Sequence, residues 1–128
     1  MSLRLLVVDD EQLARTRLGN LLADCSQPQT RVVGEAANAV DAMAFLQHHE
    51  VDALLLDIHM PGLDGLGLAR TLRSLPHPVA VVFITAYDQF AGDAFERGTA
   101  DDLLKPVMRD RMAATVARLK SRIATGQS

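Results

Sequence analysis

Short, continuous apolar runs alternate along the whole chain with segments whose apolar residues recur at helical spacing. Such runs are typical of buried strands, and the intervening segments are typical of amphipathic helices. We expect strands at 3–8, 31–36, 53–57, 79–84 and 102–104, and helices at 11–23, 39–48, 65–74, 88–97 and 109–123. In the first helix, the expected apolar face carries Leu13, Ala14, Leu18, Leu21 and Leu22. Five strands alternating with five helices predict an α/β fold, in which helices joined by right-handed crossovers cover both faces of a parallel sheet.

The bulk composition fits one ordinary globular domain. The chain has 128 residues, of which 48% are hydrophobic and 23% are charged. A net charge of −3 without a cluster of basic residues argues against nucleic-acid binding by this domain. The chain shows no basic leader and no long apolar span, so we predict neither a signal peptide nor a membrane helix, and a cytoplasmic location. The single cysteine, Cys25, cannot form an internal disulfide, and we interpret it as a small apolar side chain near a helix end.

Polar side chains follow four of the expected strands at their carboxyl ends. Asp9 and Asp10 follow the first strand, Asp57 ends the third, Thr85 follows the fourth and Lys105 follows the fifth. In open α/β sheets, ligands bind beyond the carboxyl ends of the strands, where these side chains would converge. Three converging carboxylates repel one another unless a cation joins them, and Mg²⁺ prefers oxygen ligands. The sequence therefore predicts a magnesium site built around a carboxylate that can accept a phosphoryl group.

Several other interpretations of these acids account for the sequence less well. An acid after a strand can simply cap the next helix, which is a reasonable account of Asp10 alone but not of five groups together. The sequence has no G-x-G-x-x-G motif after its first strand, no P-loop, no zinc-ligand spacing and no EF-hand loop. A hydrolase of the haloacid-dehalogenase type would need an acid two residues after its aspartate nucleophile, where this chain has His59.

Four short motifs stand at the expected strand ends: VDDE at 8–11, DIHMPGLDG at 57–65, TA at 85–86 and KP at 105–106. In order and spacing they resemble the motifs of response-regulator receiver domains, over essentially the whole chain. The resemblance implies the flavodoxin-like (βα)5 fold in three layers, with a five-stranded parallel sheet of order 2-1-3-4-5. It implies a receiver domain over residues 1–123, with 124–128 as a tail or the first residues of a linker.

Further segments of the sequence resemble one particular type of receiver domain. EQLAR at 11–15, TAYDQFA at 85–91 and AF at 94–95 are similar to receivers attached to LytTR-type DNA-binding domains. The implied function is two-component signal transduction, in which a sensor histidine kinase phosphorylates the receiver and the receiver controls a covalently linked output domain, here a LytTR-type transcriptional regulator. A homodimer through the 88–123 face is a further implied partner. The competing interpretation is a receiver-like interaction module that works without phosphorylation.

The resemblance assigns the acids of the predicted site. Asp57 would be the phospho-acceptor, taking the phosphoryl group from a phosphohistidine of the kinase. Asp10, Asp57 and the backbone carbonyl of His59 would hold Mg²⁺ directly, with Mn²⁺ as an alternative ion, and Asp9 would act mainly through water. The domain would not be an enzyme in its own right, but a phospho-acceptor that assists its own phosphorylation and dephosphorylation.

The resemblance also assigns the two groups that would contact the phosphoryl oxygens. Thr85 would donate its hydroxyl to one oxygen, and Lys105 would pair with another. Phosphoryl transfer depends mostly on positioning and on neutralising these oxygens, which a hydroxyl, an ammonium and a divalent ion can do. By the same analogy, the Lys105–Pro106 bond would be cis, a form that X–Pro bonds adopt at low cost.

Three further positions bear on the lifetime and the output of the signal. His59 and Tyr87, each two residues after a site residue, occupy positions that govern water access to the acyl phosphate in the resembled family. We hypothesise that both shield the acyl phosphate; the alternative is that they are exposed loop residues. Asp102 stands where the family has an aromatic switch residue, and a carboxylate is poorly suited to turn into an apolar interior. A solvated acid in a tolerant variant is the simpler interpretation of Asp102.

Overall fold

A computed structural model of the chain describes residues 2–25, 29–58, 65–72, 79–86 and 101–124. Its strands are β1 (Leu3–Val8), β2 (Thr30–Ala36), β3 (Ala53–Asp57), β4 (Ala80–Thr85) and β5 (Asp101–Leu104). The described helices are α1 (Gln12–Ala23), α2 (Ala39–His48), α3 (Gly65–Leu72) and α5 (Arg109–Ala124). The strands form one parallel sheet in the order β2-β1-β3-β4-β5, which confirms the predicted fold class.

Most element bounds agree with the sequence expectation to within one residue, and β1, α2 and β3 agree at both ends. β4 begins and ends one residue later than expected, because Thr85 still pairs with Leu104 of β5. β5 begins one residue earlier, because Asp101 pairs with Val82. The helix expected at 88–97 lies outside the described residues. Among the described helices, none combines the length and the apolar character that crossing a membrane requires.

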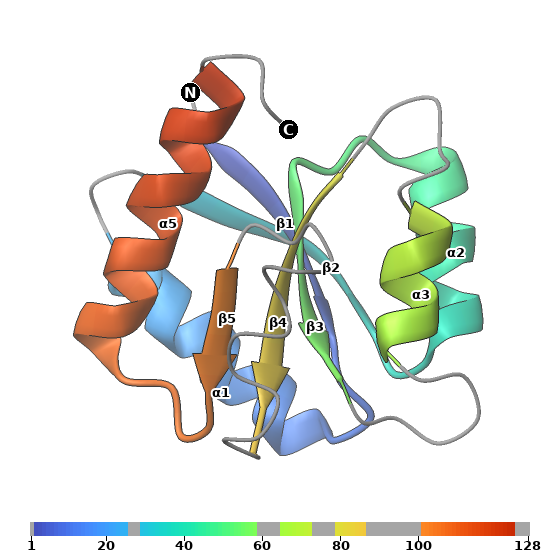
Figure 1. Ribbon diagram of the computed structural model, residues 1–128, viewed down its shortest axis with the longest axis horizontal. Coiled ribbons are helices and arrows are strands. Elements are labelled where there is room, and N and C mark those ends of the chain that lie inside the picture. Colours follow the sequence, from blue (N-terminus) through green and yellow to red (C-terminus); the bar gives the residue numbers. More distant parts are fainter. Residues whose placement is uncertain (1, 26–28, 59–64, 73–78, 87–100, 125–128) are drawn as a thin grey trace.

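Helices cover both faces of the sheet: α1 and α5 lie on one side, and α2 and α3 on the other (Figure 1). Alternate residues of each strand therefore enter two separate cores. On β1, Leu5 and Val7 pack with α1 and α5, whereas Leu6 and Val8 pack with α2 and α3. Because both faces are covered, β3 and β4 are buried along their whole length, and this explains why their sequences are apolar without alternation.

Cys25 lies just after the carboxyl end of α1, as expected. It is a free, buried cysteine that joins the core between the sheet, α1 and α5. Its thiol donates a hydrogen bond to the backbone carbonyl of Leu21 at 3.4 Å. Burial raises the pKa of this thiol, which keeps it in the unreactive protonated form.

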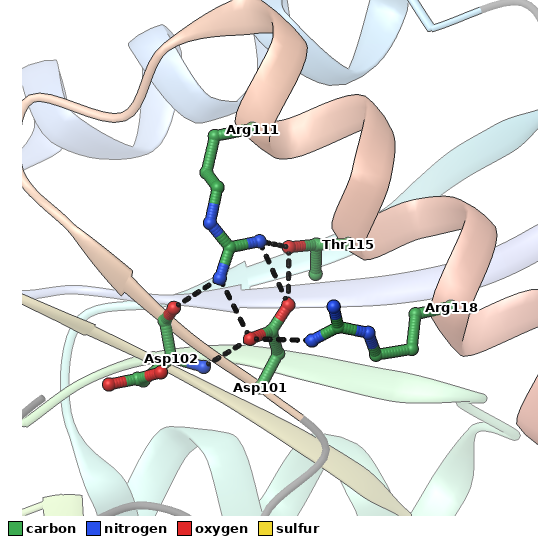
Figure 2. Close-up of polar contacts among 5 residues, drawn as sticks. All are labelled: Asp101, Asp102, Arg111, Thr115 and Arg118. Atoms are coloured by element: carbon green, nitrogen blue, oxygen red, sulfur yellow. Dashed lines mark hydrogen bonds and ion pairs between the residues drawn. The ribbon is translucent and has the colours of Figure 1, made fainter. Parts of the chain in front are cut away.

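A buried carboxylate at the start of β5 fastens this strand to α5. Asp101 is 1% exposed, and its oxygens accept hydrogen bonds from the Thr115 hydroxyl at 2.7 Å and from both terminal nitrogens of Arg111 at 2.9 and 3.0 Å. The Asp102 N–H donates to Asp101 Oδ1 at 2.9 Å, and Arg118 Nη1 lies 3.1 Å from the same oxygen. Figure 2 shows both guanidiniums and the hydroxyl reaching Asp101 from the same helix.

This arrangement keeps Asp101 ionised. Burial alone would raise the pKa of Asp101, but the hydrogen bonds from Arg111 and Thr115 outweigh burial, so its pKa lies below the ordinary value. Arg111 also donates to the backbone carbonyl of Asp102 at 3.0 Å. The first two residues of β5 are thus bound to α5 through both side-chain and backbone groups.

Candidate functional site

The polar residues predicted to converge do meet at the carboxyl edge of the sheet. Asp9 follows β1 directly, Asp57 ends β3, Thr85 ends β4 and Lys105 follows β5. The pairing of Val8 with Leu56, of Asp57 with Ile84 and of Thr85 with Leu104 puts these strand ends side by side. The strands therefore deliver two carboxylates, a hydroxyl and an ammonium to one rim, and the β1–α1 junction adds Asp10.

Three carboxylates form the centre of this site. Asp9, Asp10 and Asp57 each offer an oxygen, and these oxygens lie within 4.8 Å of one another. Asp9 and Asp57 are buried, whereas Asp10 is exposed. The site thus has two acids fixed in the protein interior and one that faces water. Such a set suits a hard cation that keeps part of its hydration shell.

Lys105 supplies the positive charge nearest these acids. Its Nζ atom lies 3.1 Å from Asp9 Oδ2 and 3.7 Å from Asp57 Oδ2. Burial lowers the pKa of Lys105, but the hydrogen bond to Asp9 and the charge of Asp57 outweigh burial and raise this pKa above its ordinary value. The ammonium is therefore charged at neutral pH and offsets part of the repulsion among the carboxylates.

Asp9 is held by backbone and side-chain contacts. Its Oδ1 accepts the Glu11 N–H at 3.0 Å, and its Oδ2 accepts the Lys105 ammonium. Its own N–H donates to the carbonyl of Ala36 on β2 at 3.0 Å. These contacts fix the end of β1 and leave Asp10 as the acid directed to solvent.

Thr85 and Lys105 are joined through the backbone. The Lys105 N–H donates to the Thr85 carbonyl at 2.7 Å, which extends the β4–β5 pairing to the edge of the site. Thr85 is buried. The Lys105–Pro106 peptide bond is cis, as predicted.

Sequence reasoning assigned no role to Arg15 of α1. Its Nη1 donates to the backbone carbonyl of Asp9 at 2.7 Å, and its Nε donates to Glu35 Oε1 on β2 at 3.0 Å. The sequence did indicate that Arg15 is unusual. Arg15 precedes Leu18 and Leu22 by three and seven positions, and it therefore shares their buried helix face. A charge on a buried face indicates a specific partner.

The remaining predicted positions divide into two groups. His59 and Tyr87 lie outside the described residues. Asp102 is partly buried in β5, and its side chain points away from Asp101 and Arg111 (Figure 2). The structure therefore brings together Asp9, Asp10, Asp57, Thr85 and Lys105, and it leaves Asp102 outside that group.

Comparison with known protein families gives one match over most of the chain. The model described as "Response regulator receiver domain" matches residues 5–117. Among curated relatives, an uncharacterized response regulatory protein of Vibrio cholerae is 44% identical over 114 residues, which is 89% of this chain and 47% of that protein. The transcriptional regulatory protein YpdB of Escherichia coli is 37% identical over 93% of this chain and 48% of its own length. The chain thus spans about half the length of these relatives.

Solved structures agree with this match. The response regulatory domain of MrkE from Klebsiella pneumoniae superposes with a TM-score of 0.84 at 35% identity, covering 96% of this chain and 99% of that one. The receiver domain of the putative response regulator NarL from Mycobacterium tuberculosis gives a TM-score of 0.81 at 33% identity, covering 94% of this chain and 98% of that one. Both similarities cover nearly the whole of this chain.

Proposed function

The chain belongs to the response regulator receiver domain family of two-component systems, and on that basis we propose that Asp57 is its phospho-acceptor. The observation that carries this proposal is the group of three carboxylate oxygens within 4.8 Å, next to the Lys105 ammonium. Asp57 shares this group with Asp9 and Asp10, and it is the member that ends a central strand.

The side chains around Asp57 suit phosphoryl transfer. An oxygen of Asp57 attacks phosphorus, the bond from phosphorus to the donor breaks, and the donor leaves with that electron pair. Charge on the phosphoryl oxygens must be neutralised during this step. We assign this to the Lys105 ammonium, which already lies 3.7 Å from Asp57, and to the hydroxyl of Thr85 at the end of the neighbouring strand.

The donor set also fits Mg²⁺, because it consists of oxygen atoms alone and includes the solvent-exposed Asp10. We propose that Asp10, Asp57 and the backbone carbonyl of His59 bind the ion and that Asp9 acts through water, with Mn²⁺ as a substitute. When bound, the ion would neutralise charge on the carboxylates and on the phosphoryl oxygens. The donor we propose is a sensor histidine kinase, as expected for this family.

We propose that phosphorylation controls an output domain of the LytTR DNA-binding type. The support is the sequence resemblance of segments 11–15 and 85–91, together with the similarity to YpdB, which is named a transcriptional regulatory protein. The similar curated proteins are about twice as long as the matched region, which leaves room for such a domain in proteins of this kind.

Incubation with acetyl phosphate and Mg²⁺, followed by intact-protein mass measurement, tests the proposed function. We expect a gain of one phosphoryl group in the wild-type chain, and no gain in Asp57→Ala or when a chelator removes the ion. Asp110→Asn, which alters an exposed acid on α5, is the matched control and should be phosphorylated like the wild type. A wild-type chain that gains no mass would instead support the phosphorylation-independent interaction module.

We propose that His59 and Tyr87 shield the acyl phosphate from water, as their positions two residues after Asp57 and Thr85 suggest. Removing either bulky side chain should admit water and shorten the lifetime of phosphorylated Asp57. The measurement is the decay of the phosphorylated mass in His59→Ala and Tyr87→Ala after the donor has been removed. Decay at the wild-type rate in both variants would contradict the proposal.

We propose that position 102 does not carry the signal to the surface, because a carboxylate there resists burial in an apolar interior. The backbone of Asp102 is also tied to α5 through Asp101 and Arg111, which restrains movement of the start of β5. Signalling would then pass through residues 85–90 and the segment 88–97. Asp102→Tyr should therefore leave phosphorylation-dependent dimerisation, measured by light scattering, unchanged, and an altered response would contradict this.

A further inference from the structure

We propose that Arg15 is a positioning residue of the cation site, and that it holds the peptide from which Asp10 projects. This inference rests on the proposed function, because it concerns the ion that would occupy the site. Arg15 does not belong to the carboxylate group itself. It lies in the first turns of α1 and contacts the backbone of Asp9.

The contacts of Arg15 connect three elements. Its Nη1 donates to the Asp9 carbonyl at 2.7 Å, at the junction of β1 and α1, and its Nε donates to Glu35 of β2 at 3.0 Å. Its side chain is only 16% exposed, although arginine is ordinarily a surface residue. Glu35 orients the guanidinium from the neighbouring strand, where it pairs in register with Val7. Two hydrogen bonds to different elements thus restrain the orientation of the guanidinium.

The Asp9 carbonyl belongs to the peptide unit that leads into Asp10. Because a peptide unit is planar, fixing its carbonyl oxygen also fixes the direction in which the chain enters Asp10. The N–H and the side chain of Asp9 are already held by Ala36, Glu11 and Lys105. The hydrogen bond from Arg15 therefore adds the restraint on the side of the peptide facing Asp10.

Asp10 needs such a restraint more than the other two acids do. Asp9 and Asp57 are buried, and neighbouring groups hold them in place, whereas Asp10 is exposed and follows the end of the strand. Groups behind metal ligands commonly orient them, and losing such a group typically weakens metal affinity about 10–100-fold. We therefore expect Arg15 to strengthen cation binding through the placement of Asp10.

Simple electrostatics predicts the opposite change in cation affinity when the charge of Arg15 is removed. Arg15 carries a positive charge close to the site, and like charges repel, so removing this charge alone should tighten the binding of a divalent cation. A positioning role predicts weaker binding after the same change. The direction of the change in affinity therefore distinguishes positioning from a purely electrostatic effect.

The experiment is a titration of the full chain with Mn²⁺, in which the paramagnetic resonance signal of the free ion reports how much remains unbound. Arg15→Met should raise the dissociation constant about 10-fold or more. Arg15→Lys should restore part of the affinity, because one ammonium can reach the Asp9 carbonyl without also holding Glu35. Arg17→Met removes the same charge from an exposed position on α1 and should leave the affinity unchanged or slightly tighter.

A second variant keeps the test independent of the folding of Arg15→Met. Glu35→Asp leaves Arg15 in place and keeps the negative charge, but its shorter side chain holds the guanidinium less closely. A positioning role therefore predicts weaker Mn²⁺ binding by this variant, whereas simple electrostatics predicts no change. If both variants bind Mn²⁺ as tightly as the wild type or more tightly, Arg15 is not a positioning residue. If the wild-type chain itself binds no Mn²⁺, the failure lies with the proposed cation site, so the two ideas are separable.

Discussion

Replacing Asp101 with alanine is expected to lower the free energy of unfolding by about 3 kcal/mol, the lower end of the range for breaking a buried ion pair. Asp101 is buried beneath α5, and groups of Arg111, Thr115, Arg118 and the following peptide all point at it. Alanine would leave the buried Thr115 hydroxyl without its carboxylate acceptor, and Arg111 and Arg118 without their counter-ion. The two arginines reach solvent, and their hydration keeps the loss from being larger.

Urea unfolding of the wild type, Asp101→Ala and two comparison variants measures this loss. Asp101→Asn keeps the shape and part of the hydrogen bonding and should lose less stability than Asp101→Ala. Asp110→Ala removes an exposed carboxylate in the first turn of α5 and should change stability by well under half as much. Equal losses in Asp101→Ala and Asp110→Ala would show that the contacts drawn in Figure 2 do not hold β5 to α5.

The contacts of Asp101 also make the free energy of unfolding depend on pH. The pKa of Asp101 is lower in the folded chain than in the unfolded chain, where an aspartate titrates near pH ~3.9. The unfolded state therefore binds the proton more readily, so the contribution of Asp101 is fully present above that pH and is lost as the pH falls through the folded pKa. The difference in stability between the wild type and Asp101→Asn should accordingly shrink as the pH falls below about 4.

The fold and the five converging residues were predictable because both follow from regular periodicity. Continuous apolar runs are what a strand buried on both faces requires, and parallel strands place their carboxyl ends on one rim. That rule locates Asp9, Asp57, Thr85 and Lys105 from the sequence alone, without any side-chain geometry. Asp10 follows from its place directly after Asp9.

The contacts of Arg15 and Asp101 were not predictable in the same way. Their partners lie on other elements, 20 positions away for Glu35 and 10 for Arg111, and helical or strand periodicity does not encode such pairs. The sequence interpretation also placed Leu13 on the apolar face of α1, yet Leu13 is 84% exposed. Leu13 precedes Leu22 by nine positions, or about two and a half helical turns, so it lies on the side of α1 opposite the core that Leu18 and Leu22 contact.

Lys105→Met is expected to slow phosphorylation of Asp57 by acetyl phosphate about 10²–10³-fold, the usual effect of removing one preorganised charge-stabilising group. The ammonium lies 3.1 Å from Asp9 and 3.7 Å from Asp57, so no movement of an element is needed to bring it to the reacting carboxylate. The measurement is the initial rate of mass gain with saturating Mg²⁺. Lys120→Met removes the same charge from an exposed position on α5 and should react at the wild-type rate.

Stability measurements on the same variant separate a local effect from a general one. Without Lys105, the buried Asp9 carboxylate loses its cationic partner, so Lys105→Met should unfold at lower urea concentration than the wild type when no divalent ion is present. The proposed Mg²⁺ site uses these acids in the folded state, so adding the ion should recover much of that loss. The positive charge of Lys105 repels Mg²⁺, so the ion should stabilise Lys105→Met more than it stabilises the wild type. Equal stabilisation of the two proteins by Mg²⁺, together with an unchanged phosphorylation rate, would mean that Lys105 does not act on the carboxylate group.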